Sequence, residues 1–162
     1  MESEGINLIK MEPSRKKPKE GDVFVIQPEK GLYYLGRVIR TNISSKDPFV
    51  NGSSLIYIYD NSVKSLEIPS SLANRELLIP PQIVNNLGWV RGYFKTIGNL
   101  PVLQEDLLED YGFWDVITQR YVDEEGKVIA KQPKVIGSYA LGSYGSVSYK
   151  VSQVLRTKKS LN

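Results

Sequence analysis

The 162-residue chain has neither cysteine nor histidine. Without cysteine it can form no disulfide and has no thiolate nucleophile, and without histidine it lacks the commonest general base. The two absences together also remove the usual ligands of zinc, copper and haem. A catalyst would have to rely on carboxylates, lysine, tyrosine, serine or a bound ion. The composition therefore favours a protein that is not an enzyme, and we expect no metal and no cofactor.

Long hydrophobic runs are absent as well. No stretch approaches the roughly 20 apolar residues that span a bilayer, and residues 1–10 lack the apolar core of a signal peptide. We therefore expect no membrane association and, with no cysteine to oxidise, a cytoplasmic location. Phenylalanine is scarce, at 4 residues against 10 tyrosines, and the 13 glycines and 9 prolines are spread along the chain as turn residues. This composition is typical of an ordered, sheet-rich domain.

Charge is distributed unevenly although the net charge is only +3. Residues 13–46 carry eight basic and three acidic side chains, residues 101–126 carry eight acids against Arg120, and residues 127–162 carry seven bases and no acid. The three surfaces either neutralise one another in the folded protein or steer a charged partner.

A β-hairpin near the N-terminus organises the remainder of the chain. Residues 23–26 and 32–40 are rich in β-branched and aromatic residues, and the polar loop 27–31 between them holds a proline and a glycine. A hairpin cannot bury its apolar face alone, so the following strands are expected to pack on it. We predict a mainly β, antiparallel, curved sheet of six to eight strands, SH3-like at its start, with one C-terminal helix. Residues 1–15 are predicted as a flexible arm and residues 16–162 as a single domain.

Further elements follow from local pattern. The apolar run Leu55–Asp60 predicts a central strand covered on both faces, and Leu77–Ile79 predicts a short strand that the next two prolines terminate. The sequence also predicts four later elements: a strand over 88–98 interrupted at Gly92, a short helix over 104–111, a strand over 113–122, and a type I turn over 123–126 that returns the chain as a hairpin.

The C-terminal helix is predicted from the spacing of apolar residues. Val147, Val151, Val154 and Leu155 recur at helical intervals, and Ser146 can cap the helix start. The glycine-rich segment 137–145 before it is interpreted as a loop or an irregular edge strand, because it lacks the pattern of a phosphate-binding loop.

Three other patterns have both a chemical and a structural interpretation. Asp106, Glu109 and Asp110 could act as paired catalytic carboxylates or could form the wet face of a helix. The acids at 123–125 could bind calcium or simply form a turn. Tyr33 and Tyr34 among basic residues could stack on nucleic acid or could face a sheet, and we favour the structural interpretation of all three.

Several short motifs resemble one known family. The segments 21–26, 34–38 and 56–60, the aromatic–Ile-Gly–Pro stretch 92–101, residues 121–126 and the helix start 144–147 are similar to the immunity protein 26 family of bacterial polymorphic toxin systems. The resemblance implies a small, mostly β, cytosolic protein without enzyme activity that binds and neutralises a toxin domain. From another class, an SH3-like nucleic-acid-binding or regulatory module is the alternative, and a carboxylate-based hydrolase is the least favoured.

The acidic stretch is the predicted partner-binding surface. Inhibitors of nuclease toxins meet a basic active site, and binding energy concentrates in a few aromatic anchors within a charged rim. Residues 105–125 alone combine acids with candidate aromatic anchors, which are Tyr111, Phe113 and Trp114. We therefore predict that Glu109, Asp110, Tyr111 and Asp115 contact a cognate toxin domain, with a nuclease as one option. Phe113 and Trp114 alternate along a strand, so at least one, with Trp114 favoured, is expected to be core.

Overall fold

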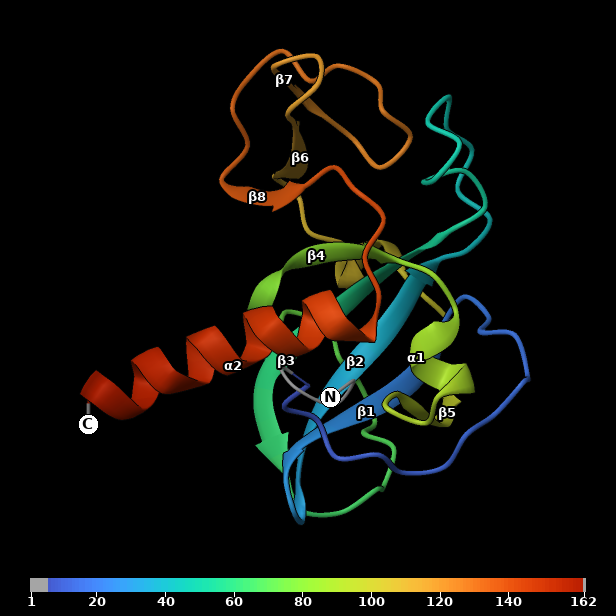
Figure 1. Cartoon of the computed structure of the whole chain (residues 1–162), viewed down its shortest axis with the longest axis vertical. Coiled ribbons are helices and arrows are strands. Elements are labelled where there is room, and N and C mark those ends of the chain that lie inside the picture. Colours follow the sequence, from blue (N-terminus) through green and yellow to red (C-terminus); the bar gives the residue numbers. More distant parts are fainter. Residues whose placement is uncertain (1–5, 162) are drawn as a thin grey trace.

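The hairpin predicted at the start of the chain is the centre of a five-stranded sheet. The computed structural model describes residues 6–161, and its elements are shown in Figure 1. They are β1 (Asp22–Glu29), β2 (Leu32–Arg40), β3 (Ser54–Val63), β4 (Leu77–Val84), α1 (Leu87–Val90), β5 (Lys95–Asn99), a 3₁₀ turn (Gln104–Asp106), β6 (Tyr111–Asp115), β7 (Arg120–Val122), β8 (Val135–Ser138) and α2 (Tyr144–Leu161). The fold is mostly β with one C-terminal helix, as predicted.

The strands form two sheets rather than the single sheet predicted. The larger sheet is antiparallel with strand order β4-β3-β2-β1-β5, and the smaller has the order β7-β6-β8 with β6 and β8 parallel. The larger sheet is not closed, because β4 and β5 are its two edges. The predicted resemblance of the first strands to an SH3 domain therefore stays a prediction.

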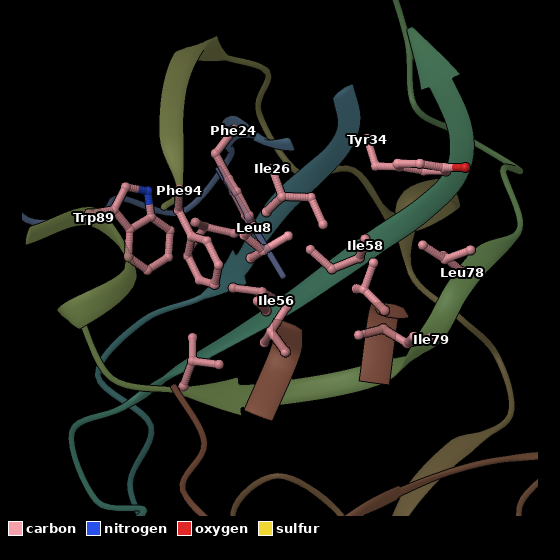
Figure 2. Packing of buried hydrophobic residues seen from close by; sticks show 14 residues of the cluster. Leu8, Phe24, Ile26, Tyr34, Ile56, Ile58, Leu78, Ile79, Trp89 and Phe94 are labelled. Carbon is pink, nitrogen blue, oxygen red and sulfur yellow. The ribbon is translucent and has the colours of Figure 1, made fainter. Parts of the chain in front are cut away.

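Both faces of the larger sheet are covered, which explains its continuous apolar runs. Successive residues of β1 alternate between two core clusters: Phe24 and Ile26 lie on one face, and Val23 and Val25 on the other. The first cluster includes Val147 and Val151 of α2 (Figure 1), and ten of its residues are labelled in Figure 2. The second cluster takes residues from the smaller sheet and from the loop after β2. A strand buried on both faces needs apolar residues at every position, and β3 meets this prediction.

The helix α2 follows the predicted apolar stripe. Val147 and Val151 are buried, and Val154 and Leu155 pack partly buried against the first cluster. The helix begins two residues before Ser146, whose Oγ accepts a hydrogen bond from the Ser143 amide at 3.0 Å and donates to its carbonyl. No helix among residues 6–161 combines the length and the apolar character needed to cross a membrane.

The prediction that prolines end β4 is wrong. Pro80 and Pro81 lie inside β4, which continues to Val84. Proline lacks an amide donor, but β4 is an edge strand and its register against β3 shifts between Ile56 and Ile58, where ladder bonds are interrupted. The missing amide donors of Pro80 and Pro81 therefore cost no ladder hydrogen bond, because each position lies either on the outer side of the edge strand or at the register shift.

Two other predicted elements are wrong. The stretch 88–98 contains α1 and β5 rather than one interrupted strand, and Gly92 has φ +87°, the conformation of a glycine that follows a helix. The predicted helix over 104–111 is only one 3₁₀ turn, because an eight-residue helix is unstable without tertiary support. Here the surroundings favour extended chain: the Leu108 amide donates to the Tyr57 hydroxyl at 3.2 Å, and Tyr111 already belongs to β6.

The long strand predicted over 113–122 is two short strands joined by a turn. β6 and β7 pair in antiparallel fashion, and Gln119, with φ +59°, lies in the turn between them. The next turn is as predicted: Gly126 has φ +86°, and its amide donates to the Asp123 carbonyl at 2.9 Å. The returning arm makes only an isolated bridge between Val122 and Val128.

The predicted N-terminal arm falls partly outside the described residues. From residue 6 onward it lies against the domain, with Leu8 buried in the first cluster. The amides of Ile9, Met11 and Ser14 donate to the carbonyls of Gln27, Gly92 and Trp89 respectively, at 2.8–2.9 Å.

Candidate partner-binding site

The predicted site residues lie on and around β6. Glu109 and Asp110 are exposed in the segment that enters the strand, as predicted for both. Their carboxylates have no ion pair or hydrogen bond with any other described residue. The Asp110 carbonyl accepts a hydrogen bond from the Val135 amide of β8 at 3.2 Å, which connects this segment to the smaller sheet. The two exposed carboxylates are therefore available to a partner.

Tyr111 has an internal partner. Its hydroxyl donates to Glu124 Oε1 at 2.8 Å, and Arg40 Nη1 lies 3.2 Å from Glu124 Oε2. Glu124 is 4% exposed, so its charge needs these two partners. Burial, and then the negative charge of Glu124, raise the pKa of Tyr111, which keeps the hydroxyl neutral and donating. Tyr111 thus connects β6 to β2 through Glu124 and Arg40, and its half-buried ring lies edge-on to Phe113.

Asp115 fixes the turn at the other end of β6. Its carboxylate oxygens accept hydrogen bonds from the Ile117 amide at 3.1 Å and from the Thr118 hydroxyl at 2.9 Å. Its carbonyl accepts from the Gln119 amide at 2.8 Å. An aspartate that bonds to the backbone two residues ahead is a standard way to stabilise a turn. Asp115 therefore positions residues 116 and 117.

Most of the acidic block has internal partners. Asp106 accepts hydrogen bonds from Arg37 Nη2 and the Leu103 amide, Asp123 from two amides of its own turn, and Glu125 pairs with Lys127. With Asp115 and Glu124, five of the eight acids in 101–126 are thus used within the chain. The exposed acids without a described partner are Glu105, Glu109 and Asp110.

An apolar tip adjoins this surface, and the sequence reasoning missed it. Val116 is 67% exposed and Ile117 is 88% exposed, at the turn between β6 and β7. The loop after β2 carries a third exposed apolar side chain, Phe49, at 75%. Both loops lie at the same end of the molecule in Figure 1, and a 2.6 Å hydrogen bond between Ser45 and Tyr139 connects that loop to the smaller sheet. The Asp-x-x-Thr pattern at 115–118 is typical of a turn, and it was the sequence signal that could have indicated exposure of Val116 and Ile117.

Phe113 and Trp114 lie on opposite faces of β6, as alternation along a strand requires. The residue in the core is Phe113, whereas the sequence analysis favoured Trp114. Phe113 is 0% exposed and belongs to the second cluster. Trp114 is half-buried and lies against the Tyr121 ring, with centroids 4.9 Å apart. Phe113 is the core residue because Gly137 of the paired β8 leaves room for its ring, at 3.1 Å from the position of a glycine Cβ.

The structure does not assemble the other candidate sites. Asp106 is buried against Arg37, whereas Glu109 and Asp110 point to solvent, and no group of three acids within residues 6–161 is arranged to hold a metal ion. In β2, Tyr34 is 8% exposed, Arg37 is 1% exposed, and Tyr33 packs partly buried against the second cluster. A stacking surface for bases requires exposed rings, so these residues do not form one. Residues 135–138 of the glycine-rich region form β8, an edge strand.

Of three comparisons with known proteins, one finds a match. The exposed acids and apolar tip on a rigid β scaffold define a candidate protein-binding surface. The sequence profile of the family described as Immunity protein 26 matches residues 19–123, which run from the lead-in of β1 to the end of β7. The match covers more than half of the chain, and the chain belongs to the Immunity protein 26 family. No curated protein and no solved structure gives a significant match.

Proposed function

We propose that this protein is a bacterial, cytoplasmic immunity protein that binds a cognate toxin domain and neutralises it without catalysis. Family membership carries the assignment to immunity, since that family name denotes inhibition of a toxin. The lack of histidine and cysteine supports a binding role over a catalytic one. The partner is a toxin domain of a polymorphic toxin system, and the proposed surface is the end of the molecule that carries β6.

The interface is proposed to combine exposed acids with an apolar anchor. Glu109 and Asp110 supply unpaired negative charge, and Val116 and Ile117 supply the apolar side chains that a partner pocket can enclose. Asp110 and Val116 are six positions apart along β6 and its ends, which is about 20 Å of extended chain at roughly 3.3 Å per residue. An interface of standard size covers about 800 Å² per partner, roughly 30 Å across. One partner can therefore contact both ends of β6.

Tyr111 and Asp115 have a positioning role in this proposal. The Tyr111 hydroxyl and the Asp115 carboxylate are each bound within the chain, so neither is free to bond a partner without breaking an existing contact. They hold the two ends of β6 that present the charged and the apolar residues. The toxin surface that fits this arrangement is basic with a shallow apolar pocket, as at the substrate-binding site of a nuclease.

The test is protection of cells that make the toxin domain encoded beside this protein. The toxin domain is expressed from a titratable promoter with and without the full chain, and survivors are counted. We expect the wild-type chain to restore growth. If it does not, the assignment as an immunity protein to that toxin is wrong, whatever surface is involved.

Charge reversal then tests the surface. Glu109→Lys with Asp110→Lys changes the surface charge by +4, and we expect association to slow about 10- to 100-fold at low salt, measured by stopped flow. The matched control is Glu67→Lys with Glu76→Lys. It makes the same charge change at two other exposed positions, in the loop between β3 and β4. Equal rates for the two double variants would exclude the acidic end as the interface.

A further inference from the structure

A basic groove lies on a different part of the molecule from β6. It has a volume of about 640 Å³, and its lining includes Lys16, Lys17, Lys19, Lys95 and the edge strand β5. One wall is the chain segment 12–19 and the other is β5. In Figure 1 this part of the chain is beside α1 and β5, away from the smaller sheet. Nothing in the proposed immunity interface uses it.

The groove has a rigid floor. Trp89 and Phe94 are 2% and 1% exposed, and their rings pack edge-to-face with centroids 5.1 Å apart. Phe24 of β1 contacts both rings at 5.2 Å, and Figure 2 shows the three side by side. The Trp89 indole donates to Thr96 Oγ1 of β5 at 3.1 Å. Hydrogen bonding thus connects the floor to the strand that forms one wall.

The opposite wall is held in place at both ends. The Ser14 amide donates to the Trp89 carbonyl at 2.9 Å, and the Lys19 amide donates to Asp22 Oδ2 at 2.9 Å. Pro18 between them is buried. The groove is therefore a built feature of the fold, rather than a space beside a loose arm.

The charge of the lining is positive. Four lysines face two acids, and both acids have partners: Glu12 lies 3.8 Å from Lys95 Nζ, and Asp22 accepts from the Lys19 amide and the Asn99 side chain. Lys16 and Lys17 are exposed, and their ammonium groups have no ion pair with any residue in the described range. Two uncompensated cations at the rim favour an anionic occupant.

β5 adds a second requirement on that occupant. It is an edge of the larger sheet, and β1 is its one neighbouring strand within residues 6–161. An edge strand offers backbone groups to another extended chain, which is how many proteins bind peptides. Nucleic acid fits less well, because single strands bind on exposed aromatic rings and both rings in this groove are buried.

We propose that the groove binds an extended acidic segment of a partner protein, which adds as a strand to the outer edge of β5 with its carboxylates toward Lys16 and Lys17. Five residues of β5 span about 17 Å, so a segment of five to eight residues fills the groove. This surface is separate from the proposed toxin interface and lets the protein hold a second chain, or a second region of one large partner.

The test uses a fluorescent eight-residue peptide of alternating glutamate and threonine, with binding to the full chain followed by anisotropy at low salt. We expect saturable binding, and chemical-shift changes of the backbone amides in β5 by NMR. Lys16→Gln with Lys17→Gln is expected to weaken binding roughly five- to tenfold. The matched control, Lys131→Gln with Lys134→Gln, removes two charges from exposed positions elsewhere and should leave binding unchanged.

Further probes separate the alternatives. A peptide N-methylated on alternate residues keeps its charge but cannot pair with a strand, and equal binding of this peptide would overturn strand addition. Tighter binding of a ten-nucleotide oligothymidine that depends on Lys16 and Lys17 would assign the groove to nucleic acid. Self-association that depends on the same lysines, seen by light scattering, would assign it to a second copy. Absence of saturable peptide binding would overturn the proposal outright.

Discussion

Two tyrosines in this protein are predicted to respond in opposite ways to the same substitution. Tyr59 in β3 is 1% exposed, and its hydroxyl makes no hydrogen bond of good geometry with a described residue, although the buried guanidinium of Arg37 lies close enough to oppose the rise of its pKa. Tyr111 in β6 donates its hydroxyl hydrogen to the buried carboxylate of Glu124. Replacement by phenylalanine removes one oxygen in each case, so the packing loss is matched and the hydrogen bonding differs.

The expected magnitudes follow from that difference. A buried hydroxyl without a partner costs about 1–3 kcal/mol of desolvation, so Tyr59→Phe should raise the free energy of unfolding by about 1 kcal/mol once lost packing is allowed for. A hydrogen bond to a charged group contributes about 1.5–3 kcal/mol, so Tyr111→Phe should lower it by that amount. At roughly 2–4 °C per kcal/mol for a domain of this size, Tm should rise by about 3 °C in the first variant and fall by about 4–10 °C in the second.

The assay is urea unfolding followed by tryptophan fluorescence, with calorimetry as a second probe. Trp89 is buried and reports loss of the first core cluster. The two-state slope should be the same in both variants, so that midpoints compare directly. A loss of more than about 1 kcal/mol in Tyr59→Phe would refute the reasoning, because it would mean that the Tyr59 hydroxyl has a partner in the native protein, with the nearby guanidinium of Arg37 as the first candidate.

Two further predictions concern alkaline stability and core packing. Burial raises the pKa of Tyr59 to about 12, against about 10 for an unfolded tyrosine, so the stability that this shift contributes is complete below pH 10 and is lost as pH rises through 12. Over that range the free energy of unfolding, measured by urea titration at each pH, should fall by about 2–3 kcal/mol more in wild type than in Tyr59→Phe. Equal falls in the two proteins would contradict this. Gly36→Ala should destabilise the protein by about 1–3 kcal/mol in thermal melts, since a Cβ there would lie 2.5 Å from the buried ring of Phe24. The control is Gly145→Ala in α2, where the nearest atom outside the helix backbone is Ile6 Cδ1 at 3.7 Å, and it should be neutral or stabilising. Equal effects of the two substitutions would show that the core around Gly36 relaxes freely.

The sequence by itself determined the elements whose signal is local and strong. The hairpin β1–β2, the apolar strand β3, the turn at Gly126 and the stripe of α2 were all predictable, because periodicity and turn chemistry act within a few residues. The exposure of Glu109 and Asp110 was predictable too, since an unpaired charge is costly to bury.

The tertiary structure alone decided which acids are free and which elements are extended. From the sequence, Asp106 and Glu124 are expected to be surface charges. Their carboxylates are buried because Arg37, about 70 residues before Asp106, and Arg40, 84 residues before Glu124, pair with them. Residues 107–111 do not continue the 3₁₀ turn as a helix, because β6 begins at Tyr111 and pairs with β8 to cover the second core cluster. Long-range pairing of this kind depends on which strands become neighbours, and no window of local sequence contains that information.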